Sequence, residues 1–355
     1  MLDFGLRPTL ETMTRNAWGL SFGSGIRPTE PTPSTRIAEG HHSDLYRFTG
    51  PAEDGGTPIL LVPPLAAPAT CFDLRPGQSL AAHLAAGGRP VYLVDYGEMR
   101  YADRGMGFEA WTDDILPRTI ETVSAHHSGS PVDVVGWSLG GTLSLLSAAA
   151  RPDLPIGSIV ALGTPIDYTR IPTIAPLRII GRFTGDRPLT STTGLLGGLP
   201  SPIVQASYRF TALPRELMRP MFIARNLHDT ESLAHMESID RFMGSMPGYP
   251  AKFFQQMCAQ LILGNSLADG YFDLDGRIVE LADIRNRVLL IAGTEDVIAP
   301  TASVEAGQTA LTGAKELRYD TVPGSHLGIV AGVRSRETTW AQIDGFLAEV
   351  SAVPA

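Results

Sequence analysis

A serine flanked by glycines is the strongest chemical signal in this chain. The stretch VGWSLGG at positions 135–141 contains the pattern G-x-S-x-G, with a short apolar run before it and a leucine- and alanine-rich run after it. A strand, a sharp turn and a helix form the context in which a serine is held as an exposed nucleophile. We therefore predict that Ser138 is a catalytic nucleophile on a strained turn. Gly136 and Gly140 are expected where a β-carbon would collide with neighbouring backbone.

An acid and a histidine follow this serine at the ends of two later predicted strands. Asp296 lies in the loop after residues 287–292, and we prefer it to the adjacent Glu295. His326 lies in the glycine-rich loop after residues 316–322 and is the only histidine beyond Asp296. The order serine, acid, histidine is that of the α/β hydrolases. We predict that His326 is the general base and that Asp296 orients it.

The first buried run of the chain ends in a loop that could stabilise an oxyanion. Pro63 and Pro64 have no N–H group, so Leu65 is the first candidate donor and Ala66 the second. The N–H of Leu139, directly after the serine, is the expected second donor to the oxyanion. The alternative is that the prolines only make a rigid exit from the strand.

Apolar runs alternate with helical patterns, which predicts a parallel, doubly wound α/β sheet in the α/β-hydrolase fold. Residues 1–40 are expected to be an extension with a Pro/Thr-rich linker, and residues 41–168 and 284–355 the core, with its edge strand near residues 45–48. Residues 169–283 lack a strong strand pattern and predict an inserted, mainly helical cap. Their methionines and phenylalanines suit an apolar acyl pocket, but they fit the core of a cap or a dimer face equally well.

Composition excludes several other classes of function. The chain has 355 residues, a net charge of −9 and 43% hydrophobic residues, which argues against nucleic-acid binding. Its two cysteines, Cys71 and Cys258, are far apart and predict neither a disulfide scaffold nor a zinc site. The start of the chain does not look like a secretory signal and no run reaches the length of a membrane span, so we expect a cytoplasmic enzyme.

Most of the eight histidines have no expected chemical role. The adjacent pairs His41-His42 and His126-His127 lack metal-ligand spacing, and we expect them on the surface. His228 and His235 fall in the predicted cap, where they could touch substrate. Acyl transfer by a serine needs neither a cofactor nor a metal, and none is expected.

Around these motifs the chain resembles the catalytic subunit of class III polyhydroxyalkanoate synthases. The matching stretches are Val62-Pro63-Pro64, DLRPGQSL at 73–80, Asp95-Tyr96-Gly97, Tyr101-Ala102-Asp103-Arg104, Gly140-Gly141-Thr142, TPIDY at 164–168 and GSHLGI at 324–329. The resemblance implies a hydroxyacyl-CoA or hydroxyacyl-ester substrate, a cap over the site, and a homodimer formed through the cap. It also implies a second synthase-type subunit or the surface of a polymer granule as a partner.

The resemblance implies a cysteine nucleophile where this chain has Ser138. An acyl group on serine is an oxyester, whose transfer to another hydroxyl is nearly isoenergetic, whereas water removes it irreversibly. We therefore expect hydrolysis of hydroxyacyl esters, thioesters or oligomers. One alternative is a synthase-type acyltransferase that polymerises 3-hydroxyacyl-CoA in a dry site. Another alternative is a catalytically silent granule-surface or scaffold protein.

Overall fold

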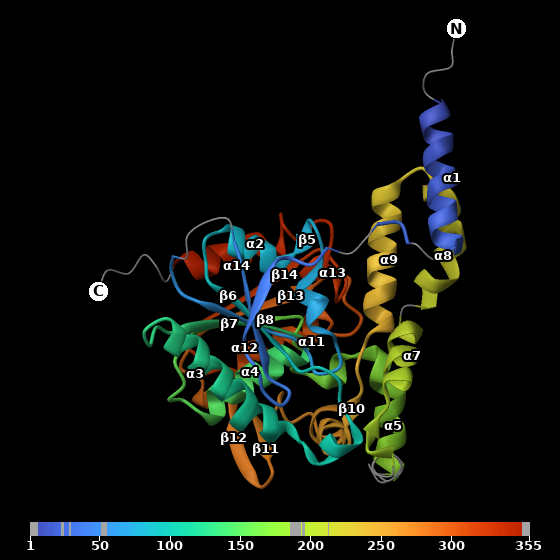
Figure 1. Cartoon of the computed structure of the whole chain (residues 1–355). Coiled ribbons are helices and arrows are strands. Elements are labelled where there is room, and N and C mark those ends of the chain that lie inside the picture. The colour runs from blue at the N-terminus through green and yellow to red at the C-terminus, as the bar shows by residue number, and fades with distance from the viewer. Residues whose placement is uncertain are drawn as a thin grey trace.

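An eight-stranded sheet runs through the larger part of the molecule (Figure 1). The computed structural model describes residues 6–22, 25–27, 30–50, 55–184, 193, 196–211 and 213–349. The strands lie in the spatial order β1 (Ser34–Ala38), β2 (Asp44–Phe48), β6 (Val91–Asp95), β3 (Ile59–Val62), β7 (Val132–Trp137), β8 (Ile156–Leu162), β13 (Arg287–Gly293) and β14 (Glu316–Val322). From β6 to β14 every pair is parallel.

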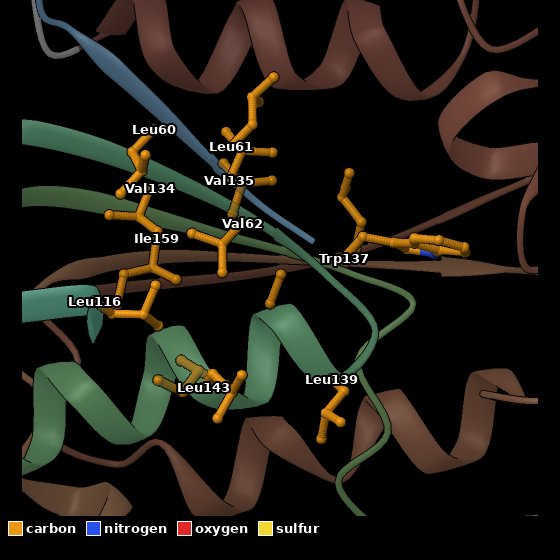
Figure 2. Close-up of a cluster of buried hydrophobic side chains, with 14 of the residues drawn as sticks. Leu60, Leu61, Val62, Leu116, Val134, Val135, Trp137, Leu139, Leu143 and Ile159 are labelled. Atoms are coloured by element: carbon orange, nitrogen blue, oxygen red, sulfur yellow. The ribbon is translucent and has the colours of Figure 1, made fainter. Parts of the chain in front are cut away.

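The inner parallel strands are mainly apolar because both faces of the sheet are covered there, whereas β14 at the edge of the sheet is polar at alternate positions and half-buried. In β3 and β7 every residue is buried. Figure 2 shows Leu61 and Val135 on adjacent strands, with Leu143 of the following helix packed beneath the sheet. The buried apolar side chains form one continuous core, so the sheet edge that carries the strand exits is a rigid platform.

Helices cover both faces of this sheet, as the alternating pattern predicts. Figure 1 places α2 and α14 on one face and α3 and α4 on the other. The helices of the core are α2 (Leu80–Ala86), a π-helical turn (Ala110–Ile115) continuous with α3 (Leu116–His126), α4 (Leu139–Ala150), α11 (Thr301–Glu305), α12 (Gly307–Ala310), α13 (Gly328–Ala331) and α14 (Thr339–Ala348). This arrangement confirms the predicted doubly wound fold class. The last residues of the predicted core, 350–355, lie outside the described residues.

The sheet begins before the position that the sequence pattern predicts. β1 pairs antiparallel with β2, which in turn pairs antiparallel with β6. β1 is thus the edge strand and residues 45–48 form the second strand, so the predicted edge strand was wrong. β1 was missed because its residues are exposed or half-buried and carry almost no apolar signal.

Residues 169–283, which we call the cap segment, are mainly helical. Their elements are α5 (Ala175–Thr184), β9 (Gly198–Leu199), α7 (Ser201–Thr211), α8 (Leu213–Asn226), α9 (Thr230–Gly244), β10 (Tyr249–Pro250), α10 (Ala251–Gln256), a π-helical turn (Met257–Leu263), β11 (Tyr271–Leu274) and β12 (Arg277–Glu280). In Figure 1 helices α5, α7, α8 and α9 stand beside the sheet domain, together with α1 (Leu6–Phe22). The boundaries of the cap stay a prediction.

The hairpin formed by β11 and β12 corrects the expectation that this segment has no clear strand. Asp275 and Gly276 at its turn both have positive φ, as the tight turn of a two-residue hairpin requires. None of the helices in the described part of the chain has the length and apolarity needed to cross a membrane.

An aromatic stack joins the cap segment to the core. The rings of Phe108 and Phe253 lie 4.0 Å apart at an interplanar angle of 11°, and Trp111 meets Phe253 edge-on at 5.2 Å. All three side chains are fully buried.

Replacing this contact should destabilise the whole molecule. We expect Phe253→Ala to lower the free energy of unfolding by about 3–5 kcal/mol, because it leaves a cavity in the stack. Tyr271→Ala, at a partly exposed position, is the control, and a change of about 0.5 kcal/mol or less is expected there. Denaturant titration measures both, and equal losses in the two variants would contradict the role of the stack.

Candidate functional site

Ser138 lies at the turn between β7 and α4 in a strained backbone conformation. Its φ is 53° and its ψ is −122°, a region that residues with a side chain rarely adopt. The turn is fixed by hydrogen bonds: Ser138 N–H donates to the Leu162 carbonyl at 2.7 Å, and the Ser138 carbonyl accepts from Gly141 N–H at 3.0 Å. The serine is half-buried at the N-terminus of α4. This is the geometry predicted for a nucleophile on an elbow.

The flanking glycines permit two close backbone contacts, as predicted. A β-carbon on Gly136 would lie 2.6 Å from the nitrogen of Gly141. A β-carbon on Gly140 would collide with the Val62 carbonyl oxygen and lie 2.8 Å from the Pro63 carbonyl carbon. The N-terminus of α4 therefore rests directly on the exit of β3, a position that no larger residue could hold.

His326 and Asp296 form a buried hydrogen-bonded pair. His326 Nδ1 lies 2.6 Å from Asp296 Oδ2. The other carboxylate oxygen, Oδ1, accepts from the N–H groups of Ile298 and Ala299 at 2.8 Å each. Because an ionised carboxylate only accepts, Nδ1 carries the proton and Nε2 keeps its lone pair for a proton from another group.

Two contacts place this pair near the elbow. Trp137, the neighbour of Ser138, donates from Nε1 to the His326 carbonyl at 3.1 Å. Gly163 is the second link, because it directly follows Leu162, whose carbonyl accepts the hydrogen bond from Ser138 N–H. A β-carbon on Gly163 would lie 3.3 Å from both Asp296 Oδ2 and His326 Cε1. The exits of β7, β8, β13 and β14 thus bring the predicted serine, acid and histidine to one edge of the sheet.

The predicted oxyanion donors lie on either side of the Gly140 contact. Leu65 is fully buried in the loop after β3, and Leu139 is the first residue of α4. In the described part of the chain neither backbone N–H has a protein acceptor, whereas Ala67 N–H already donates to the Pro64 carbonyl. Two unused donors beside a helix N-terminus are suited to hold a developing negative charge.

A mostly apolar cavity of about 340 Å³ lies against the histidine. It is enclosed by the β14 exit loop and α13 on one side and by α7 and α9 of the cap segment on the other. Its lining includes Leu74, Trp137, Tyr208, His235, Ile239, Phe242, Met243, Met246, Val297, Ile298, Ser325 and His326. Ser138 is not one of the residues that line it, so a molecule in this cavity meets His326 first.

The methionines and phenylalanines of the cap segment serve more than one purpose. Phe242, Met243 and Met246 line the cavity, as the pocket interpretation predicts. Phe253 belongs to the core, and Met218 is exposed on α8.

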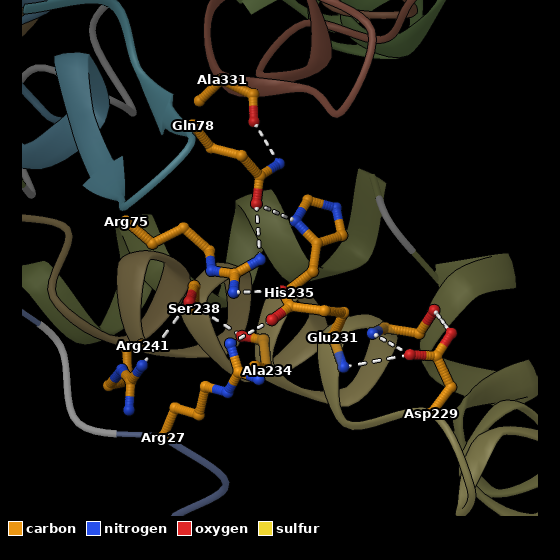
Figure 3. A network of polar contacts seen from close by, with 11 residues as sticks. Arg27, Arg75, Gln78, Asp229, Glu231, Ala234, His235, Ser238, Arg241 and Ala331 are labelled. Atoms are coloured by element: carbon orange, nitrogen blue, oxygen red, sulfur yellow. Dashed lines mark hydrogen bonds and ion pairs between the residues drawn. The ribbon is translucent and has the colours of Figure 1, made fainter. Parts of the chain in front are cut away.

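A polar network that sequence reasoning missed holds α9 over this cavity. Gln78 Oε1 accepts from His235 Nδ1 at 2.9 Å and from Arg75 Nη1 at 3.1 Å, while Gln78 Nε2 donates to the Ala331 carbonyl at 2.8 Å (Figure 3). Arg75 also pairs with Glu231 at 2.7 Å. The DLRPGQSL stretch was the signal for this network, because its polar residues bridge α9 to α13, just beyond His326.

The predicted surface placement of His42 was wrong. Only 9% of this residue is exposed, and its Nδ1 lies 2.5 Å from the Tyr96 carbonyl. His41 and His126 are exposed, whereas His127 is half-buried and bonds Tyr92. The burial of His42 depends on contacts more than fifty residues away, which spacing alone does not reveal.

Neither cysteine is placed to replace Ser138. Cys71 and Cys258 are both buried. Burial raises the pKa of the Cys71 thiol well above its usual value, so this thiol stays protonated and is a poor nucleophile.

Known proteins resemble this chain in both sequence and fold. It is 24% identical to the poly(3-hydroxyalkanoate) polymerase subunit PhaC of Allochromatium vinosum, over 96% of this chain and 97% of that protein. It is 23% identical to the PhaC subunit of Thiocystis violacea, over 83% and 82% of the two chains. The solved structure of BpoC from Mycobacterium tuberculosis is similar with a TM-score of 0.51, at 14% identity and 88% and 99% coverage, a likeness of fold alone.

These similarities agree with the fold and the elbow described above. The match to the alpha/beta hydrolase family extends over residues 59–331, from β3 through α13, and so includes the serine, the acid and the histidine. This chain therefore belongs to the alpha/beta hydrolase family.

Proposed function

We propose that this protein is a serine-dependent acyl-transfer enzyme that hydrolyses hydroxyacyl esters or thioesters. The observation that carries the proposal is the position of Ser138 on a strained elbow, at the edge of the sheet where His326 is bonded to Asp296. The similarity to PhaC subunits over nearly the whole chain supports a hydroxyacyl substrate.

In the first half of the reaction the enzyme becomes acylated. Ser138 Oγ attacks the acyl carbonyl and its proton passes to His326 Nε2, while Asp296 stabilises the imidazolium that forms. The negative charge on the carbonyl oxygen is held by the N–H groups of Leu65 and Leu139. The bond to the leaving thiol or alcohol then breaks, and the leaving group takes the proton from His326.

In the second half the acyl group leaves the enzyme. Water gives a proton to His326 Nε2 and attacks the Ser138 ester, and His326 returns the proton to Ser138 as the free acid departs. The same two N–H groups hold the second oxyanion. No cofactor takes part in these steps.

Hydrolysis is favoured over polymerisation by the chemistry of an oxyester. Chain growth from Ser138 would exchange one oxyester for another and gain little free energy, while hydrolysis proceeds to completion. The partly exposed Val297 at the cavity wall supports access of water. A mostly apolar cavity of about 340 Å³ suits a short acyl chain.

Polymerisation remains the second candidate, because the similarity to PhaC polymerase subunits extends over 96% of this chain. In that case the acceptor would be the hydroxyl of a second hydroxyacyl group. A silent scaffold is the third candidate, and the intact serine, acid and histidine argue against it.

The products formed from 3-hydroxybutyryl-CoA distinguish these candidates. We expect free thiol and 3-hydroxybutyric acid in equal amounts, measured by thiol titration and mass spectrometry. Ser138→Ala should lower turnover by at least about 1,000-fold, since it removes the nucleophile. Ser130→Ala, which removes an exposed hydroxyl elsewhere, should leave turnover unchanged.

Two results would refute the proposal. Polymer as the main product would establish the synthase alternative. If the protein turned over neither this thioester nor any activated ester, the silent scaffold would be the only remaining candidate.

An exposed apolar face on α8 supports the expected homodimer. Leu217, Met218, Met221 and Phe222 are 72%, 52%, 43% and 40% exposed. Leu217 and Met221 are four residues apart, as are Met218 and Phe222, so the four side chains lie on one side of the helix. We propose that a second copy of the chain covers this face; helix α8 itself stands beside α1, apart from the sheet (Figure 1).

A charge on this face should dissociate the dimer. We expect the wild-type protein to have the mass of two chains by light scattering, and the double variant Leu217→Glu, Met221→Glu to have the mass of one. Ile278→Glu, at a 56% exposed position on β12, is the control and should leave the dimer intact. A wild-type monomer at micromolar concentration would contradict this assembly.

A further inference from the structure

Two histidines and an aspartate meet at a second cavity, which shares no lining residue with the cavity beside His326. His41 and His42 form the turn between β1 and β2, and Asp103 lies in the 3₁₀ turn Tyr101–Gly105 after β6. One ligand atom from each of these residues lies within 4.8 Å of the others. The proposed acyl-transfer mechanism uses none of the three.

The backbone of His42 is bent so that consecutive rings reach the same carboxylate. Neighbouring side chains on an extended chain point in opposite directions. His42 has a φ of 55°, and the His41 and His42 ring centroids lie 4.1 Å apart. His41 Nε2 is 3.0 Å from Asp103 Oδ1, and His42 Nε2 is 3.2 Å from Asp103 Oδ2.

His42 presents a buried nitrogen with no hydrogen-bond partner in the described part of the chain. Its Nδ1 lies 2.5 Å from the Tyr96 carbonyl, and because a carbonyl only accepts, Nδ1 carries the proton. In the neutral ring Nε2 then holds a lone pair. This atom is buried and faces Asp103 Oδ2 at 3.2 Å, a contact that does not meet the geometry of a hydrogen bond. The lone pair of the neutral ring therefore points at a carboxylate oxygen, and a cation between the two atoms would relieve their repulsion. An unpartnered buried nitrogen costs free energy unless something binds it.

The hydrogen bonds around His42 and Asp103 are of the kind that orient metal ligands in proteins. A metal-bound histidine usually donates its other ring N–H to a carbonyl or carboxylate, as His42 does to Tyr96. The carboxylate of Asp103 is itself held by Arg100 N–H, which donates to Oδ2 at 2.6 Å. The two histidines approach different oxygens of Asp103, and each separation is close to the roughly 3.3 Å between donor atoms around tetrahedral zinc.

The surrounding surface favours a cation. The three residues border a cavity of about 560 Å³ whose wall also carries Glu39, Asp44, Asp95, Glu98 and Arg100. Arg36 pairs with Glu39 and Asp44 at 3.1 Å each, which leaves the carboxylates of the wall in excess of its arginines. His41 is exposed, so the site is open to solvent and water can complete the coordination.

We propose that His41, His42 and Asp103 bind one divalent first-row transition metal ion of the zinc type. Two imidazoles and one carboxylate form a ligand set that suits Zn²⁺ and discriminates against Mg²⁺ and Ca²⁺, which prefer oxygen ligands alone. The ion would tie the turn between β1 and β2 to the segment after β6. That segment leads to the stack of Phe108 on Phe253, so the role of the metal is to stabilise the attachment of the cap segment.

Zinc titration of the full chain, freed of any histidine tag and stripped with a chelator, tests this site. We expect one Zn²⁺ per chain in competition with a chromophoric chelator, and a rise of the thermal midpoint when zinc is added. His41→Ala should weaken zinc binding by at least about 100-fold, because even an indirect partner of a metal ligand contributes roughly 10–100-fold. This side chain is exposed, so the apo variant should keep the wild-type fold, and only the rise of its thermal midpoint on adding zinc should be lost.

A histidine–carboxylate pair elsewhere serves as the matched control. His83 Nε2 lies 2.7 Å from Asp344 Oδ2, and His83→Ala should leave zinc affinity unchanged. Wild-type protein that retains no zinc would overturn the proposal, as would a His41→Ala variant that loses less than about tenfold in affinity. Either result would mean that the three residues form only a hydrogen-bonded cluster. These experiments measure zinc binding and thermal unfolding, so their outcome does not depend on whether Ser138 is catalytic.

Discussion

The contact between Gly140 and the exit of β3 governs the geometry of the proposed active site. Because Gly140 has no side chain, the N-terminus of α4 rests on the carbonyl groups of Val62 and Pro63. Leu139, at the start of α4, and Leu65, two residues after Pro63, are the N–H donors that we propose for the oxyanion. The same contact forces Ser138 into its unusual backbone conformation. The strain is sustained by the buried parallel strands around it, which over-determine the turn.

The cap segment completes the site through polar contacts that span the chain. Gln78 uses its whole amide to join Arg75, His235 and the Ala331 carbonyl. Because Gln78 is 4% exposed, these hydrogen bonds are costly to break. They fix α9 relative to the loop that carries His326, so the shape of the apolar cavity depends on residues that do not react. The proposed metal cluster would tie the turn between β1 and β2 to the segment that leads to Phe108, which stacks on Phe253 of the cap segment.

Strand exits could be predicted from the sequence, while long-range side-chain contacts could not. The positions of Ser138 and Asp296 follow from the buried strands β7 and β13, whose apolar runs are visible in the sequence, and His326 follows the half-buried edge strand β14. β1 was missed because it is an exposed edge strand with little apolar pattern. The burial of His42 and the bond from Gln78 to His235 escaped prediction because their partners lie 54 and 157 residues away. Periodicity reports local structure and not such pairings.

The most direct test of the account is to locate a covalent serine probe on the enzyme. After reaction with an alkyl fluorophosphonate, a crystal structure should have the phosphorus on Ser138 Oγ, where it stands in for the tetrahedral carbon of the acyl intermediate. Its phosphoryl oxygen should lie within hydrogen-bond distance, about 2.7–3.1 Å, of the N–H groups of Leu65 and Leu139. A probe bound to any other residue, or an oxygen turned away from both N–H groups, would contradict the account.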